Sequence, residues 1–290
     1  AEAVGQWLWA DAGAGADLET LLSNPARHTF STMPEGWPPM LRAVPARGGE
    51  DGARHMAALP EVIRERYSTG RPLVCLCGVL PRINRAWVTV DASLFLWRFD
   101  KPGDIPLEYR GQEQAISAVG LVEPRRGVFW EAISQLLVIC TPVEISLLGV
   151  VLQPGATGDE LEELTLQPMP MYTISSDAVM MLCIAVAAGR IFMGGDDGHL
   201  YELQYSSGEK WMQKRCKKVC LTSNLWASFL PGFLQTKPSP LEQIAIDESR
   251  GILYTRHRNS AIFVFDIGQG CRGSPVKVAE CTNLPEVAKR

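Results

Sequence analysis

The sequence predicts an all-β fold, a β-propeller of which this chain holds about four blades. Two observations carry the prediction. From residue 72 onward, short apolar runs of five to eight residues alternate with turn residues, which is typical of many short strands. One unit also recurs four times: an apolar strand, a tight polar turn, and a second strand with alternating aromatic or apolar residues. Blades of four strands repeat about every 40–50 residues in propellers.

The repeated unit is a hairpin. It occupies residues 86–99, 135–148, 190–205 and 251–266. Four apolar residues mark equivalent positions in it: Trp87, Leu137, Phe192 and Leu253. These residues lie 50, 55 and 61 positions apart, which fits blades whose loops differ in length. We expect the hairpin to form the outer pair of strands in each blade. A β-sandwich is the alternative, because it also produces regularly spaced short strands.

Three of the hairpins have turns that suit a positive φ angle. Asp196-Asp197-Gly198 contains a glycine, which adopts that conformation without steric cost. Asp91 and Asn259 occupy comparable turns, and we expect the same geometry there.

Residues 1–58 are predicted to form an irregular N-terminal arm, and residues 59–290 the partial propeller. The arm is rich in Pro, Gly and Ala at 34–45 and 47–52. A short helix is expected at 16–22, with Asp17 as its N-cap. The segment 59–67 has helical spacing and a proline near its start.

Composition and motifs point away from catalysis and from nucleic acid. The formal net charge of −4 lacks the basic excess of nucleic-acid-binding domains. No nucleophile elbow, phosphate-binding loop or zinc-protease motif occurs, so we expect no catalytic residue, cofactor, metal ion or small-molecule substrate. The strand aromatics are expected to pack between blades. Eight cysteines in 290 residues, several inside apolar runs, indicate a reducing compartment.

Five separate segments resemble a known family. They are GVLPRINRAWVTVDASLFLWRFD at 78–100, AVGLVEPRRGVF at 118–129, LLVICTPVEISLLGV at 136–150, GRIFMGGDDGHLYELQY at 189–205 and LEQIAIDESRGILYTRHRNSAIFVFDIG at 241–268. In this order they are similar to the large inner-ring scaffold nucleoporins, which have an N-terminal β-propeller followed by an α-solenoid. The resemblance covers residues 59–268.

The resemblance implies a seven-bladed ring, of which this chain would be the first half or somewhat more. It also implies a non-enzymatic scaffold subunit of the nuclear pore complex, located in the nucleus at the nuclear envelope. Protein import and mRNA export would depend on it, and its partners would be other inner-ring nucleoporins. A protein-binding propeller of another membrane-coat or tethering complex is the alternative, because fold alone does not determine function.

The segment 219–236 (VCLTSNLWASFLPGFLQT) has eighteen residues without a charge. Its apolar residues fall on one stripe of a helix: Leu221, Leu225, Trp226, Phe229, Leu230, Phe233 and Leu234. Just before it stands a basic flank: Lys210, Lys214, Arg215, Lys217 and Lys218. An apolar stripe opposite a small uncharged polar face is typical of helices that insert into curved lipid surfaces, and nearby cations favour anionic lipid.

The resemblance implies a membrane-binding loop of this kind, between the third and fourth repeats. We therefore expect the apolar stripe to contact the nuclear membrane surface. Two alternatives remain at this level: a contact with a protein partner, or packing on the side of the propeller. Pro231 would break or kink the helix near its C-terminal third.

Overall fold

The computed structural model describes residues 40–42, 56–70, 74–101, 103–154, 162–208, 214–222 and 238–282. The chain divides into two compact units, residues 1–59 and 60–290. In the first unit the described residues form an antiparallel pair of short strands, β1 (Met40–Arg42) and β2 (Met56–Ala58). The helix predicted at 16–22 lies outside the described residues.

The second unit begins with helix α3 (Glu61–Gly70), which confirms the helix expected from the spacing at 59–67 and extends it. The carbonyl of Pro60 accepts hydrogen bonds from the N–H groups of Ile63 and Arg64 at 3.1 and 3.2 Å. A proline suits this first turn because its missing N–H would have no partner there. Ile63 is buried while most of the helix is exposed, so one residue anchors α3, which contacts β4.

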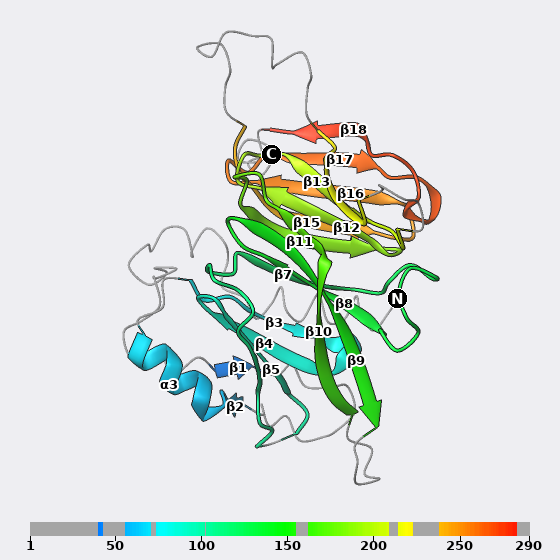
Figure 1. Ribbon diagram of the computed structural model, residues 1–290. Helices are drawn as coiled ribbons and strands as arrows, with labels where there is room; N and C mark the ends of the chain where they lie inside the picture. Colours follow the sequence, from blue (N-terminus) through cyan, green and yellow to red (C-terminus); the bar gives the residue numbers. More distant parts are fainter. Residues whose placement is uncertain are drawn as a thin grey trace, which may run out of the picture. The chain divides into compact units, whose positions relative to one another are not determined.

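Four antiparallel sheets of four strands follow, and in each sheet the strands lie side by side in chain order (Figure 1). The first blade holds β3 (Cys77–Leu80), β4 (Arg85–Val90), β5 (Ser93–Arg98) and β6 (Leu107–Tyr109). The second holds β7 (Ala118–Val122), β8 (Gln135–Cys140), β9 (Glu144–Pro154) and β10 (Glu162–Ser175). The third holds β11 (Met181–Ala187), β12 (Arg190–Gly195), β13 (Leu200–Tyr205) and β14 (Cys216–Cys220). The fourth holds β15 (Leu241–Asp247), β16 (Ile252–His257), β17 (Ile262–Asp266) and β18 (Val276–Cys281).

This repeated meander is a propeller blade, so the predicted fold class is confirmed over the described residues. Short 3₁₀ turns lie at Pro81–Ile83 and Gln269–Cys271. All eight cysteines are free.

The repeated hairpin is the central pair of strands in each blade, and its predicted place as the outer pair was wrong. The four hairpins correspond to β4–β5, β8–β9, β12–β13 and β16–β17, the second and third strands of their sheets. Central strands are paired on both edges, and β4 and β12 are buried along their whole length. The edge strand β18 is exposed at almost every residue. The apolar pattern is therefore strongest in the middle of a blade.

Three apolar clusters hold successive blades together. The cluster between the first and second blades contains Trp87, Leu96, Leu137 and Leu148. A second cluster, between blades two and three, is built around buried residues of β8, β9, β12 and β13. The cluster between the third and fourth blades includes Phe192, Leu241, Leu253 and Phe265. The second and third blades lie between two neighbours, so both of their faces bury apolar side chains, which is the main favourable term in folding.

The turns confirm two of the three predicted positive φ angles. Gly198 has φ 81° and Asp91 has φ 52°. In the fourth hairpin the prediction for Asn259 was wrong, because Ser260 adopts the left-handed conformation, with φ 65°. Asn259 instead accepts a hydrogen bond from the N–H of Ala261 at 3.1 Å through its side-chain Oδ1. The amide side chain thus braces a turn whose tight residue is its neighbour.

The first strands of the second, third and fourth blades lie next to one another: β7 contacts β11, and β11 contacts β15. Since every blade has the same strand order, the turns between its first and second strands come to the same face of the arc of blades. Loops from different blades can therefore meet there, although they are far apart in the sequence.

Candidate functional site

The start of the predicted amphipathic segment belongs to the third blade. Val219 and Cys220 are the last residues of β14 and pair with Glu202 and Tyr201 of β13. The N–H of Leu221 then donates to the carbonyl of Leu200 at 2.8 Å. The segment 219–222 is thus an extension of the sheet, and the prediction of a helix was wrong for these four residues.

The side chains of Leu221 and Thr222 face the protein. Leu221 packs, partly buried, against the cluster between the third and fourth blades. Thr222 Oγ1 accepts a hydrogen bond from the N–H of Leu200 at 2.9 Å. Leu221 is therefore not part of an exposed stripe. The other six apolar residues predicted to contact the membrane lie outside the described residues: Leu225, Trp226, Phe229, Leu230, Phe233 and Leu234.

The basic flank divides into engaged and exposed cations. The Lys218 side chain is 8% exposed, and its Nζ lies 3.2 Å from Asp177 Oδ2 and 5.0 Å from the centre of the Tyr201 ring. This contact lowers the pKa of Asp177. Arg215 is half-buried, whereas Lys214 and Lys217 are exposed. Lys210 lies outside the described residues. The structure thus leaves Lys214 and Lys217 able to meet an external surface.

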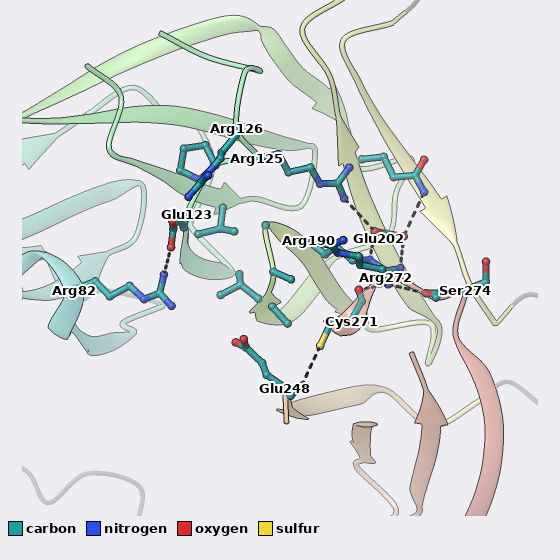
Figure 2. A pocket seen from close by; sticks show the side chains of 18 residues that line it. Arg82, Glu123, Arg125, Arg126, Arg190, Glu202, Glu248, Cys271, Arg272 and Ser274 are labelled. Atoms are coloured by element: carbon teal, nitrogen blue, oxygen red, sulfur yellow. Dashed lines mark hydrogen bonds and ion pairs between the residues drawn. The ribbon is translucent and has the colours of Figure 1, made fainter. Parts of the chain in front are cut away.

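A cavity of about 940 Å³ opens on the face where the first turns of the four blades meet. We call it the arginine pocket. Its lining comes from Arg82, from Val122–Arg126 after β7, from Val186–Arg190 between β11 and β12, from Glu202 and Gln204 on β13, from Glu248 after β15, and from Cys271–Ser274 before β18 (Figure 2). Five arginines and three glutamates line it. Every blade contributes at least one residue.

A buried ion pair forms one wall of the arginine pocket. Arg190 donates from Nε to Glu202 Oε1 at 2.7 Å and from Nη2 to Oε2 at 3.0 Å (Figure 2). Burial by itself would raise the pKa of Glu202, but the hydrogen bonds and charge of Arg190 outweigh it, and the pKa lies below its ordinary value. Glu202 is therefore ionised and neutralises Arg190.

Arg190 also joins the third blade to the fourth. Its Nη1 donates to the carbonyl oxygens of Cys271 and Gly273 at 2.9 and 2.8 Å. Its guanidinium stacks over the Phe192 ring at 4.6 Å from the ring centre. Burial raises the pKa of the Cys271 thiol. These contacts engage all three guanidinium nitrogens of Arg190 with acceptors of the protein, so Arg190 stabilises the wall of the pocket.

Arg125 is held in place through its backbone and its flat face. Its N–H donates to the Tyr205 hydroxyl at 3.1 Å, and that hydroxyl donates to the carbonyl of Gly189 at 2.7 Å. The guanidinium lies 5.3 Å from the centre of the Tyr205 ring, and its Nη2 is 3.8 Å from Glu202 Oε1. The two-residue turn Ala188-Gly189, with φ 48° and 73°, brings this carbonyl to the hydroxyl.

The remaining arginines lie on the rim. Arg82 pairs with Glu123 at 3.1 Å, with both side chains more than half exposed. Arg126 and Arg272 are exposed, and within the described part of the chain neither makes a hydrogen bond or ion pair. These two guanidinium groups face solvent with all their donors available.

Sequence reasoning did not identify the arginine pocket. Its residues come from five loops, each of which looks like an ordinary polar turn. The signals present in the sequence were the Arg125-Arg126 pair, inside the quoted segment 118–129, and the Ala188-Gly189 turn, where the quoted segment 189–205 begins. Neither signal shows that the loops converge.

The described residues offer neither a metal site nor a membrane-spanning helix. In the ranges that the structure describes, no group of three or more His, Cys, Asp or Glu side chains could hold a metal ion. Among the same residues, no helix has both the length and the apolar character needed to cross a membrane. Cys216 and Cys220, the two ends of strand β14, therefore belong to no such metal-binding group among the described residues.

The family model that matches this chain and the similar proteins named below are all nucleoporins. The nucleoporin family model described as "Nup133 N terminal like" matches residues 53–289. The nuclear pore complex protein Nup154 of Drosophila melanogaster is 37% identical over 216 residues, 73% of this chain and 15% of that protein. A probable nucleoporin of Schizosaccharomyces pombe is 33% identical over 218 residues, 74% of this chain and 16% of that protein. The chain thus spans less than a fifth of these relatives.

A solved structure supports the fold. The crystal structure of the Chaetomium thermophilum Nup170 NTD–Nup53 complex has a TM-score of 0.66 and 28% identity. The similarity covers 77% of this chain and 30% of that chain.

Proposed function

The chain belongs to the nucleoporin family whose model is described as Nup133 N-terminal-like, and on that premise we propose that it is part of a scaffold subunit of the nuclear pore complex. The observation that carries the proposal is the match of this family model to residues 53–289, which include all four blades. The location would be the pore in the nuclear envelope, in the inner ring. Protein import and mRNA export would depend on the assembled subunit.

A binding scaffold suits the way in which the blades are built. The faces between successive blades are buried in apolar contacts, so the loops and outer strand edges remain available to partners. Other nucleoporins are the proposed partners. Nup53, which is bound to the Nup170 NTD in the similar crystal structure, is the first to test. The family match favours this reading over a propeller of a vesicle coat or tether.

The partner proposal is tested with this chain and Nup53 of the same organism. We expect saturable binding by isothermal titration calorimetry, and a fluorescent fusion of the chain concentrated at the nuclear rim. An unrelated β-propeller of similar size serves as the control in both assays. Absence of binding to Nup53 and to other inner-ring nucleoporins, with a diffuse distribution in cells, would contradict the scaffold role. Selective capture of coat subunits would support the alternative.

We further propose that the segment after Thr222 contacts the nuclear membrane surface. The support is its sequence: residues 223–236 carry no charge and include Trp226 and Phe229, and Lys214 and Lys217 before it are exposed. Such a segment gains free energy from apolar insertion at packing defects, and the lysines add attraction to anionic lipid.

The membrane proposal is tested by flotation with small and large liposomes. We expect Trp226→Asp/Phe229→Asp to abolish binding to small liposomes and to leave the circular dichroism spectrum unchanged. The matched control is Val276→Asp/Val278→Asp on β18, where two side chains that are 60% and 56% exposed receive the same change. Flotation that persists in the Trp226→Asp/Phe229→Asp variant would contradict membrane contact. Loss of nucleoporin binding in that variant would assign the segment to a protein contact.

A further inference from the structure

The arginine pocket carries an excess of positive charge after its internal pairs are counted. Glu202 is matched by Arg190, and Glu123 by Arg82. One carboxylate, that of Glu248, remains against Arg125, Arg126 and Arg272. Arg125 lies 3.8 Å from the already paired Glu202 and is 40% exposed. In a chain of net charge −4, this local excess is the opposite of the average surface.

The free arginines have a geometry that suits oxygen anions. A guanidinium presents its N–H donors in a planar fork that matches a carboxylate or phosphate with two parallel hydrogen bonds. Arg126 and Arg272 come from loops of different blades, one after β7 and the other before β18. Both are exposed. Neither group has to break a bond within the described part of the chain in order to take a ligand.

Apolar residues also line the arginine pocket. Val186 on β11 is partly exposed and Ala188 in the following tight turn is exposed, whereas Val122 and Ala187 are buried. The accessible surface of Val186 and Ala188 can accept a small aliphatic group, while the arginines bind charge. Pockets that combine an apolar lining with a few placed polar groups are the usual form of a binding site.

We propose that the arginine pocket binds a peptide segment of a partner protein that carries carboxylate or phosphate groups next to an aliphatic residue. Arg126 and Arg272 bind the anionic groups, and the lining at Val186 and Ala188 receives the aliphatic side chain. The volume of about 940 Å³ accommodates several side chains, which is more than a lone inorganic ion fills. This proposal does not depend on which complex the chain belongs to.

The lining also argues against single-stranded nucleic acid as the ligand. Single-stranded nucleic acids are bound by stacking their bases on exposed aromatic side chains beside a basic groove. Among the residues that line the arginine pocket there is no Phe, Tyr, Trp or His. The Tyr205 ring beneath Arg125 is buried and covered. The chemistry offered is anion binding with aliphatic contact, which a peptide satisfies.

Fluorescence anisotropy on the full chain tests the proposal. The probes are labelled peptides with a Glu-Glu-Leu core or a phosphoserine-Glu-Leu core, and a neutral peptide with a Gln-Gln-Leu core. We expect both acidic peptides to bind, the neutral peptide not to bind, and the affinity to fall as ionic strength rises. The stronger of the two acidic peptides identifies carboxylate or phosphate as the natural source of charge.

Arg126→Glu/Arg272→Glu should weaken acidic-peptide binding by at least about tenfold, a change of about 1.4 kcal/mol. Both residues are exposed, so the thermal midpoint should stay unchanged. The matched control is Lys214→Glu/Lys217→Glu, which makes the same charge change at two exposed lysines outside the pocket and should bind like the wild type. The proposal is overturned if no acidic peptide binds, if both variants bind equally, or if a labelled single-stranded RNA binds more tightly than every peptide.

Discussion

Replacing Glu202 by leucine should destabilise the chain strongly, because it leaves the Arg190 guanidinium charged and buried. The two side chains are 5% and 10% exposed and share two hydrogen bonds of 2.7 and 3.0 Å. Breaking a buried ion pair by removing one partner typically costs about 3–5 kcal/mol, since the other charge is left without compensation. We expect a loss of this size for Glu202→Leu. Arg125, whose Nη2 lies 3.8 Å from Glu202 Oε1, also loses its negatively charged neighbour in this variant.

The reverse change and the double variant separate the pair from simple loss of packing. Arg190→Met should cost about as much as Glu202→Leu, because it removes the bonds to Cys271 and Gly273 and leaves the buried Glu202 without its two hydrogen bonds from Arg190. Once Arg190 is gone, removing Glu202 as well relieves that uncompensated charge. The double variant should therefore cost no more than Arg190→Met alone, which gives a coupling free energy at least as large as the cost of Glu202→Leu, about 3–5 kcal/mol.

Urea unfolding followed by tryptophan fluorescence measures these free energies. The control is Arg82→Met, whose partner Glu123 is 69% exposed; loss of an exposed pair costs less than about 1 kcal/mol. The reasoning would be refuted if Glu202→Leu cost no more than Arg82→Met, or if the double variant equalled the sum of the two single variants.

Three further predictions concern acid, a turn and an interface between blades. Because the pKa of Glu202 is lowered in the folded state, its stabilisation is complete above the ordinary glutamate pKa of about 4.3 and is lost as the pH falls through the lowered value; the urea midpoint of the wild type should fall more steeply below pH 5 than that of Glu202→Leu. Gly251→Ala should lower the thermal midpoint far more than Gly103→Ala: both have positive φ, but a Cβ on Gly251 would lie 2.1 Å from the Gly268 carbonyl oxygen, whereas at Gly103 it would meet nothing within 4 Å. Phe192→Ala, at a fully buried position between the third and fourth blades, should cost about 3–5 kcal/mol in urea unfolding, and a loss under about 1 kcal/mol would contradict the assigned core.

The strands and turns could be predicted because their signals are local. Alternating apolar runs and residues such as Gly198 report on neighbours a few positions away, and helix α3 follows from its own spacing. The prediction of a positive φ was wrong for Asn259 and correct for Gly198, although both rested on the same kind of local signal. Asparagine and serine both occur in tight turns, so the sequence did not show which of Asn259 and Ser260 would carry the positive φ.

The candidate sites could be predicted only in part. The apolar character of 219–236 is visible in the sequence, but the role of Leu221 depends on where β14 ends and on the fourth blade packed beside it. Lys218 likewise looks like its neighbour Lys217 until Asp177 is placed next to it. The arginine pocket depends on residues of five loops whose proximity no local pattern records.

The repeat in the sequence determined that this chain forms successive four-stranded blades, because each blade contains the same strand and turn pattern. Only the tertiary structure shows which of the two alternating sets of side chains in a strand packs against the preceding blade and which against the following one. Trp87 and Leu137 look equivalent in the repeat, yet both lie in the cluster between the first and second blades, so they occupy opposite faces of their own sheets. Where a blade lies between two neighbours, both of its faces are buried and both alternating sets of side chains are apolar, so the sequence pattern does not show which set faces which neighbour. The same stacking, and no local signal, brings Arg126 and Arg272 to one pocket.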